Sequence, residues 1–405
     1  MNILFVHRDF PGQFGALAER LAQSTHHRVA FVTSADVILP GRIMVRRFHA
    51  KRRPSASTHH YLHGFEAGVL NGQAVFEACH ALHEEGFVPD VIFGHCGWGV
   101  ALYLREVFPK ARFIGYFEWY YHPHDADADY LDPNGMTPDN ACRIRTLNAP
   151  LLMTLEDVDF GLVPTAFQRS QLPASYQHKL QTLHDGVDTE YFKPDAAACR
   201  RFGDVELRGV NRLLTYATRG LEPYRGFPEF MRALVGVLKA EPDVVVAVAG
   251  QDQTFYSRRL PDGETYKERM LRELPQLDLA RIHFLGTLPR DDYRRLLQIS
   301  TVHVYLTVPF VPSWSLVEAM SCGCHIVASD TEPTREVLGD QTAAHFIDHR
   351  DVAQLEKVLR QALAQKDTAS KLREAARSRA VSHFSQASLL PEWERIALGA
   401  SNKVG

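Results

Sequence analysis

VHVYLTVPFVPSWSLVEAMSCGCHIVA, residues 302–328, is the stretch that decides the fold of this chain. Its apolar and β-branched beginning, residues 302–307, predicts a strand, and the prolines that follow predict a loop. A short helix is predicted from about Ser315, and a turn at Gly323 leads into a second predicted strand that begins at His325. A strand, a loop and a helix N-terminus that feed a further strand form the place where a parallel α/β sheet holds a phosphate.

The helix that is predicted from Ser315 has two interpretations. Unpaired backbone N–H groups and a partial positive charge at a helix N-terminus favour an anionic ligand. Glu318 lies one turn into this helix, within reach of such a ligand. In the alternative interpretation Ser315 and Glu318 form an S-x-x-E capping box, and the glutamate only holds its own helix start. The local pattern leaves both open.

Length and composition bound the class of protein. A chain of 405 residues suits two domains of about 200 residues. Its 45% hydrophobic and 23% charged residues are typical of a globular protein, and a net charge of −3 gives no support to nucleic acid as a partner. No apolar run approaches the roughly 18 residues of a membrane span, and the N-terminus does not resemble a signal peptide. Scattered cysteines without C-x-x-C predict free thiols, so we expect a cytoplasmic protein.

Strand-like and helix-like segments alternate along the whole chain, with amphipathic stretches such as 14–23 between apolar runs. This alternation predicts two Rossmann-like α/β domains with doubly wound parallel sheets. We expect domains over 1–195 and 196–382, a seam in the polar stretch 192–204, and a terminal helix within 383–405 that packs back on the first domain. The predicted strands are 3–7, 28–33, 43–48, 91–95, 113–117, 160–164, 180–183, 213–218, 244–249, 282–285, 302–307, 325–329 and 344–347.

Two features near the N-terminus have a plain and a functional interpretation. Gly12 lies between the first strand and its helix, without a G-x-G-x-x-G pattern, so it serves either the turn or the close approach of a ligand. Residues 42–53 hold Arg42, Arg46, Arg47, Lys51, Arg52 and Arg53. They form either a solvated edge or a face for an anionic acceptor or lipid head groups at the inner membrane surface.

The segments GHCGWG (94–99) and IGYFEWYYHPHDADADY (114–130) each follow a predicted strand, at the sheet edge where ligands bind. Aromatic faces there can stack on a sugar ring, and a carboxylate or imidazole can hold hydroxyls. For each residue alone, packing or a loop hydrogen bond remains the alternative, but together they favour a site. The candidates are His95, Trp98, Glu118, Trp119, Tyr120 and Tyr121.

The same segment contains residues that imitate a metal site, namely His122, His124, Asp125, Asp127 and Asp129. No second acidic partner stands at a diagnostic spacing from them. We therefore predict an acidic loop near the acceptor and no metal.

In the second half, TYATRGLEPYRGFPEF (215–230) places Arg219 and Arg225 around a turn between a strand and a helix. Either arginine alone can be solvated. Together with the helix that begins near Ser315 they predict a diphosphate site, because the planar guanidinium forms bidentate, charge-assisted bonds. Further strands end at Gly250 and at Gly286, and the exposed backbone of Thr287 and Leu288 suits the edges of a nucleobase.

These segments together resemble the family-4 glycosyltransferases, retaining enzymes of the GT-B fold, most strongly from 213 to 340. The resemblance implies an acceptor-binding first domain and a nucleotide-sugar-binding second domain, with the donor diphosphate on Arg219 and Arg225 and the ribose hydroxyls on Glu318. HDGVDTEYFKP (184–194) resembles the interdomain motif of that family. An exopolysaccharide subgroup, the ExpC-like transferases, is more similar still through HRDFPGQF, GHCGWG, YFEWYY, LEPYRGF and PFVPSWSLVEAM.

Two positions depart from the family pattern. Phe310 stands where the family usually has a glutamate, eight residues before Glu318, and Glu118 stands where it usually has a histidine. The implied chemistry is transfer of a sugar from a nucleotide sugar to a hydroxyl of a glycan or lipid-linked glycan, without metal or other cofactor. A sugar phosphorylase and a non-catalytic glycan-binding scaffold of the same fold remain the alternatives.

Residue roles follow from this resemblance and from the patterns above. The predicted catalytic residues are Glu118, Arg219 and Arg225. The predicted donor-binding residues are Gly12, Arg219, Arg225, Gly250, Thr287, Leu288, Ser313, Trp314, Ser315 and Glu318. The predicted acceptor-side residues are His95, Trp98, Trp119 and Tyr120.

Overall fold

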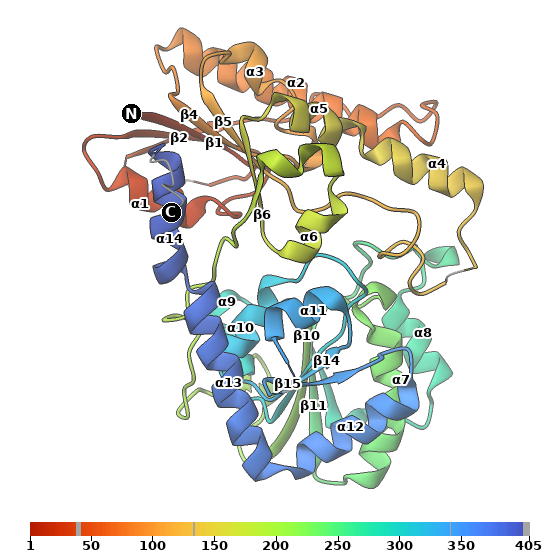
Figure 1. Ribbon diagram of the computed structural model, residues 1–405. Coiled ribbons are helices and arrows are strands. Elements are labelled where there is room, and N and C mark those ends of the chain that lie inside the picture. The colour runs from red at the N-terminus through yellow and green to blue at the C-terminus, as the bar shows by residue number, and fades with distance from the viewer. Residues whose placement is uncertain (38–41, 133, 341, 400–405) are drawn as a thin grey trace. The chain divides into compact units, whose positions relative to one another are not determined.

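The computed structural model describes residues 1–37, 42–132, 134–340 and 342–399 (Figure 1). They form two compact units, which we call unit 1 and unit 2. Unit 1 contains residues 1–186 and the chain from Gln386, and unit 2 contains residues 187–385. The division therefore falls at 186 and 385, where the sequence analysis placed boundaries at 195 and 382. Residues 400–405 of the predicted terminal segment lie outside the described residues.

Unit 1 is built on a parallel seven-stranded sheet in the order β3-β2-β1-β4-β5-β6-β7. Its strands are β1 (Asn2–Val6), β2 (Arg28–Thr33), β3 (Ile43–Arg47), β4 (Val91–His95), β5 (Arg112–Tyr116), β6 (Phe160–Val163) and β7 (Leu180–Thr182). Its α-helices are α1 (Gly15–Ala22), α2 (His63–Glu84), α3 (Leu104–Val107), α4 (Pro138–Leu147), α5 (Ala149–Asp157), α6 (Ala166–Gln171) and α14 (Gln386–Ala397).

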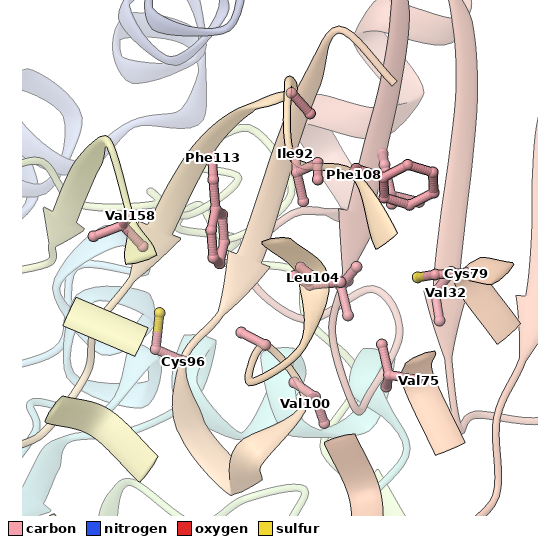
Figure 2. Close-up of a cluster of buried hydrophobic side chains, with 14 of the residues drawn as sticks. Val32, Val75, Cys79, Ile92, Cys96, Val100, Leu104, Phe108, Phe113 and Val158 are labelled. Atoms are coloured by element: carbon pink, nitrogen blue, oxygen red, sulfur yellow. The ribbon is translucent and has the colours of Figure 1, made fainter. Parts of the chain in front are cut away.

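Both faces of this sheet are buried, as expected for a parallel sheet covered by helices. Alternate residues of β1 belong to different clusters: Leu4 and Val6 pack with α2, α3 and α5, and Ile3 and Phe5 pack with α1 and α14. Figure 2 shows part of the first cluster, in which Phe113 of β5 and Leu104 of α3 lie among aliphatic side chains. The period of two along the strand thus explains the uninterrupted apolar run ILFV, residues 3–6.

The C-terminal helix α14 belongs to unit 1. Trp393 is 1% exposed and its indole Nε1 donates a 2.9 Å hydrogen bond to the carbonyl of His184. Arg20 of α1 and Glu394 of α14 form an ion pair of 2.8 Å. A buried indole with a satisfied N–H fixes this helix on the face that α1 covers.

Unit 2 is built on a parallel six-stranded sheet in the order β12-β11-β10-β13-β14-β15. Its strands are β10 (Arg212–Gly220), β11 (Val244–Gln251), β12 (Ile282–Gly286), β13 (Val302–Tyr305), β14 (Ile326–Ser329) and β15 (Ala344–Ile347). Its α-helices are α7 (Phe227–Ala240), α8 (Tyr266–Glu273), α9 (Arg290–Gln298), α10 (Trp314–Ser321), α11 (Glu332–Leu338), α12 (Val352–Ala364) and α13 (Lys366–Phe384).

The structure confirms the predicted fold class, because each unit is a doubly wound parallel α/β sheet. Every predicted strand is present, with ends that differ by a few residues. One element was not predicted: β8 (Arg201–Phe202) and β9 (Val205–Glu206) form a short antiparallel hairpin within the expected seam. Such short pairs carry too little periodic pattern to be recognised in a polar stretch.

Each sheet has one point at which the strand order reverses. In unit 1 the chain runs from β1 out to β3 and returns at β4, which pairs with β1. In unit 2 it runs from β10 out to β12 and returns at β13, which pairs with β10. Ligands of open α/β sheets bind beyond the carboxyl ends of the strands at such points. The residues after β1, β4, β10 and β13 are therefore the candidates for function.

Candidate functional site

Arg225 is the central residue at the reversal point of unit 2. It follows β10 in the turn η3 (Pro223–Arg225), it is only 8% exposed, and its Nη1 donates a 2.8 Å hydrogen bond to Thr307 Oγ1. Among the described residues no carboxylate forms an ion pair with it. Burial acts to lower the pKa of Arg225 and the neighbouring tyrosines and the charge of Glu222 act to raise it, but no carboxylate of the described chain contacts the guanidinium directly. A buried guanidinium without a direct ion-pair partner fits an anionic ligand.

Gly226 brings this turn close to the strand end that follows β13. Its φ is +64°, and a Cβ atom there would lie 2.6 Å from Cβ of Leu306. A side chain at this position is therefore disfavoured by the backbone conformation and could be accommodated only if Leu306 moved. The glycine allows Arg225 to reach Thr307.

Arg219 differs from Arg225 in its surroundings. It lies near the end of β10, is exposed, and places its guanidinium carbon 4.2 Å from the ring centroid of Phe255. An exposed guanidinium on an aromatic face keeps its planar N–H groups available to an anion.

The N-terminus of α10 is one residue earlier than predicted. Ser313 is the N-cap, and its Oγ accepts a 3.1 Å hydrogen bond from the N–H of Ser315. The N–H of Ser313 donates to the hydroxyl of Tyr305 at 3.0 Å. Both amides are thus already bonded inside unit 2, and a ligand that used them would have to replace these bonds.

The capping-box interpretation of Glu318 is wrong. Because Ser313 is the N-cap, Glu318 is the fifth residue of α10 and lies beyond the third helical position that a capping box requires. Burial raises the pKa of Glu318 to about 7, although hydrogen bonding by Tyr293 and the positive charge of Arg290 act in the opposite direction. The side chain is therefore turned toward α9 and is half-buried there.

A cavity of about 400 Å³ lies beside the ends of β11 and β12. Of the residues predicted to bind the donor, Gly250 and Thr287 line it. Leu288 instead packs against a buried cluster. The full lining is Leu221, Val248, Gly250, Gln251, Asp252, Gln253, Lys267, Phe284, Gly286 and Thr287.

Phe310 lies in an aromatic cluster beside Arg225. Its ring centroid is 5.3 Å from that of Tyr224 and 5.5 Å from that of Tyr256. Tyr256 in turn lies 5.4 Å from the guanidinium carbon of Arg225. The position where the resembling family has a carboxylate is therefore occupied here by an apolar contact between rings.

The sequence analysis missed Glu222, which is fully buried between the two arginines along the chain. Its Oε2 accepts hydrogen bonds from the backbone N–H groups of Phe255, Tyr256 and Ser257, at 3.1, 3.0 and 2.8 Å. The sequence showed only a glutamate between Arg219 and Arg225. Its hydrogen-bond partners lie more than thirty residues further along the chain, so the local pattern could not indicate its role.

At the reversal point of unit 1, Glu118 is held on both oxygens. His95 Nε2 lies 3.2 Å from its Oε2, and Gln13 Nε2 donates to its Oε1. His7 Nε2 lies 2.7 Å from Gln13 Oε1, and the two histidine rings are 4.6 Å apart. Gly97 N–H donates to His95 Nδ1 at 3.0 Å, which leaves Nε2 as the protonated nitrogen of the neutral ring. The sequence analysis missed His7 and Gln13.

The charges of this network follow from burial and hydrogen bonding. Burial and the neighbouring His95 lower the pKa of His7 to about 4. Burial acts to raise the pKa of Glu118, but the contact with His95, the electrostatic effects of His95 and His7 and the hydrogen bond from Gln13 outweigh it, so the net shift is downward. Near pH 7 the network therefore holds an ionised carboxylate beside a neutral His7.

Trp98 and Gly12 complete this edge of unit 1. Trp98 has a φ of +55°, is 39% exposed, and stacks on His95 at 4.6 Å. A tryptophan in the left-handed region is uncommon and marks a position worth attention for function. Gly12 has a φ of +50°, and a Cβ atom there would lie 2.7 Å from the ring of His7, which favours the turn interpretation of this glycine.

Trp119 and Tyr120 lie apart from this network. Trp119 is 5% exposed and packs on Phe167 at 5.8 Å. Tyr120 packs against the cluster that contains α2 and α5, with its ring 5.5 Å from that of His122. In the same segment His124 pairs with Asp129 at 3.3 Å, and the described residues contain no group of three or more acidic, histidine or cysteine side chains able to hold a metal.

Most of the basic side chains of 42–53 are paired within unit 1. Lys51 lies 2.7 Å from Glu77, and Arg47 lies 2.6 Å from Asp36. Arg46 and Arg52 contact Glu85 and Glu66 in the same way. The positive charge of this segment is thus largely balanced by neighbouring carboxylates. Across the described part of the chain, no helix combines the length and the apolarity that a membrane crossing needs.

Comparison with known proteins adds to this geometry. The family model "Glycosyl transferase family 4 group" matches residues 25–192, and the model "Glycosyl transferases group 1" matches residues 207–379. The chain is 28% identical over 249 residues to an MMP α-(1→4)-mannosyltransferase of Mycolicibacterium hassiacum, over 61% of this chain and 52% of that protein. It is 28% identical to a phosphatidyl-myo-inositol mannosyltransferase of Mycobacterium leprae, over 43% of this chain and 41% of that protein. The chain thus aligns with about half of the length of these curated relatives, or less.

Among solved structures, HepE of Anabaena in complex with UDP and glucose superposes with a TM-score of 0.71 at 16% identity, over 98% of this chain and 100% of that one. The chain has two doubly wound units, each with polar side chains at its reversal point. Together with this superposition, that architecture identifies a protein of the GT-B fold. Because the two family models together match most of the chain, it belongs to the family-4, group-1 glycosyltransferases.

Proposed function

We propose that this protein transfers a glycosyl group from a nucleoside-diphosphate sugar to a hydroxyl of a glycan or lipid-linked glycan, with retention of anomeric configuration. The observation that carries the proposal is the buried guanidinium of Arg225, which forms no ion pair in the described chain and follows the strand whose end carries Arg219. A departing nucleoside diphosphate supplies the missing negative charge.

The roles of the unit 2 residues follow from the charge that develops in the reaction. When the bond between sugar and diphosphate breaks, Arg219 and Arg225 stabilise the negative charge that builds on the phosphate oxygens. The acceptor hydroxyl attacks from the same face and gives its proton to the leaving phosphate, so no carboxylate nucleophile is required. Glu318 accepts hydrogen bonds from the ribose hydroxyls, and the cavity lined by Gly250 and Thr287 takes the base.

In unit 1 we assign Glu118 to the sugar. Its ionised carboxylate is fixed by His95 and Gln13, so it can accept hydrogen bonds from sugar hydroxyls without first reorganising. Trp98 is exposed, with His95 stacked on its ring and the guanidinium carbon of Arg8 3.9 Å from its centroid, so we assign its exposed edge to the acceptor.

The comparisons suggest which donors to test first. Two relatives are named as mannosyltransferases, and HepE is described with UDP and glucose, so UDP-glucose and nucleoside-diphosphate mannose head the series. The segments that resemble the ExpC-like transferases support a place in exopolysaccharide synthesis. Contact with a membrane surface through 42–53 receives little support from the structure, because the ion pairs there balance most of its charge.

A thermal-shift screen against UDP, GDP, ADP, dTDP and their common sugars, with and without magnesium, tests the proposal. We expect one nucleotide to raise the melting temperature of the protein without metal. When the corresponding sugar nucleotide is incubated with an acceptor, we expect NMR to show that it is consumed and that an α-linked product forms. A shift with inorganic phosphate and a glycan but with no nucleotide would identify a phosphorylase instead. Binding of glycan alone would indicate a non-catalytic scaffold.

A further inference from the structure

The loop after β11, residues 252–258, is attached to the β10 turn through the buried side chain of Glu222. Its Oε2 accepts hydrogen bonds from three consecutive backbone N–H groups, those of residues 255–257. Three N–H groups that converge on one carboxylate oxygen form an anion-binding nest, and charge-assisted bonds of this kind are stronger than neutral ones. Glu222 thus replaces the helix or sheet partners that this loop lacks.

Other contacts join the same two segments. The N–H of Tyr224 donates to Ser257 Oγ at 3.1 Å, and the N–H of Leu221 donates to the carbonyl of Gln251 at 3.0 Å. A Cβ atom at Gly220 would lie 2.6 Å from the carbonyl oxygen of Gln253 and 2.7 Å from the ring of Phe255. The loop therefore lies directly on the turn, at a separation that only glycine permits at position 220.

The loop carries the aromatic partners of both candidate phosphate-binding arginines. Phe255 lies 4.2 Å from the guanidinium carbon of Arg219, and Tyr256 lies 5.4 Å from that of Arg225. Tyr256 is 42% exposed and so is not held by burial in the core. Because Glu222 bonds the backbone of these same two residues, it determines where both rings stand relative to the arginines.

Glu222 achieves this without forming an ion pair with either arginine in the described chain, although its charge helps to raise the pKa of Arg225. Its Oε2 is saturated by amides, its buried Oε1 has no hydrogen-bond partner among the described residues, and it forms no ion pair in that part of the chain. A carboxylate between two arginines would ordinarily pair with one of them and compete with an anionic ligand. The nest directs the negative charge of Glu222 to the loop instead.

We propose that Glu222 is a positioning residue of the diphosphate site, which acts by holding Phe255 and Tyr256 against Arg219 and Arg225. This inference rests on the proposed function, in which those arginines bind the donor diphosphate. The loop at 255–257 is then the aromatic wall of the site, and its rings set the orientation of the two guanidinium groups.

The experiment compares three changes in the full-length protein. Glu222→Ala removes the nest, Glu222→Gln keeps an oxygen acceptor but removes the charge, and the double substitution Phe255→Ala with Tyr256→Ala removes the rings and keeps the nest. Glu229→Gln is the control, since Glu229 is a partly buried glutamate of unit 2, on α7, and it contacts Arg232 at 3.5 Å. Amide hydrogen exchange at 255–257, the affinity for nucleoside diphosphate, and kcat and KM for the donor are measured for each.

We expect Glu222→Ala to release the protected amides of 255–257 and to weaken nucleoside-diphosphate binding about tenfold or more, the scale of losing charge-assisted bonds. Glu222→Gln should retain part of the amide protection and part of the nucleotide affinity. The double variant Phe255→Ala with Tyr256→Ala should lose a similar amount of affinity while its amides stay protected. Adding Glu222→Ala to this double variant should weaken binding little further. The control should match the wild type.

Two outcomes would overturn the inference. One is a ring-less variant with wild-type affinity and kinetics. The other is a Glu222→Ala variant that loses melting temperature but keeps wild-type donor kinetics at a temperature where it is folded. If the wild type itself binds no nucleotide, the proposed function fails, and the exchange data still report separately whether Glu222 anchors the loop.

Discussion

Arg225 Nη1 lies 2.8 Å from the hydroxyl oxygen of Thr307, and this bond joins the turn after β10 to the strand end after β13. It fixes a buried positive charge where the strand order of unit 2 reverses. Preorganised charge at such a point can stabilise a leaving group without rearrangement. It therefore stabilises the transition state more than the charge of a mobile surface arginine does.

Replacing either arginine should therefore impair catalysis. We expect Arg225→Ala and Arg219→Ala each to lower kcat/KM by about 10²-fold or more, the scale of losing one preorganised charge stabiliser. Arg232→Ala, which removes a surface arginine of α7 paired with Glu229, is the control and should change little. Steady-state kinetics with the donor found in the nucleotide screen measures the effect. Near-normal rates in both variants would end the diphosphate assignment.

Glu318 should make nucleotide binding depend on pH. Burial raises its pKa from 4.5 to about 7, and the ionised form offers the ribose hydroxyls two acceptor oxygens and stronger, charge-assisted bonds than the protonated form. We expect the affinity of the wild type to rise as pH increases through about 7, and that of Glu318→Gln to be weaker and nearly flat. Calorimetric titration from pH 5.5 to 8.5 measures this, and parallel profiles for both proteins would contradict it.

The same group affects stability in a direction that can be worked out. Between pH 4.5 and about 7 the folded state binds more protons at Glu318 than the unfolded state does. The free energy of unfolding therefore falls as pH rises through this window. The Glu318→Gln variant should lose this pH dependence. The melting temperature of the variant minus that of the wild type should therefore be larger at pH 8 than at pH 5. A variant that is less stable at both pH values to the same degree would show that Glu318 is chiefly structural.

Glu118→Gln should affect turnover and spare nucleotide binding, since Glu118 lies in unit 1 and the proposed nucleotide site lies in unit 2. We expect kcat to fall about 10²-fold, the lower range for losing one preorganised hydrogen-bonding group. Glu77→Gln, which breaks an exposed ion pair with Lys51, serves as the control. Wild-type turnover by Glu118→Gln in every donor and acceptor tested would remove this residue from the mechanism.

Gly226→Ala should destabilise unit 2 through two effects. Its φ of +64° costs a side chain about 1–2 kcal/mol, and the new Cβ would meet Leu306 at 2.6 Å. Gly203→Ala is the matched control, with a φ of +56° and no atom within 4 Å of the added carbon. Urea unfolding should therefore show a larger loss for Gly226→Ala than for Gly203→Ala. Equal losses would mean that the turn moves freely away from β13.

The elements that could be predicted from sequence are those with a local cause. Val91–His95 and Ala344–Ile347 were located at their observed ends, because apolar runs between polar turns need no distant partner to be recognised. Arg219 and Arg225 could be proposed for the same reason, since they follow a strand and precede a helix. The capping-box alternative for Glu318 could not be excluded locally, because it depends on which serine caps the helix.

The residues that escaped prediction are those whose role depends on contacts far along the chain. Glu222 meets 255–257 only when β10 and β11 pair in parallel. His7 and Gln13 can be recognised as part of the Glu118 network only when β1, β4 and β5 bring them beside His95 and Glu118. Trp119 and Tyr120 were grouped with His95 because they are near Glu118 in sequence, but their side chains pack in other directions.

By itself the sequence determined two parallel α/β sheets, the strand ends where sheets of this kind bind ligands, and the arginines and carboxylates present there. These properties follow from hydrophobic period, turn chemistry and side-chain charge, which act over a few residues. Tertiary structure alone decided which charge is buried without a partner, as at Arg225, and which is bound by backbone amides, as at Glu222. Burial and hydrogen-bond partners belong to the packed chain, because they are set by residues that only folding brings together.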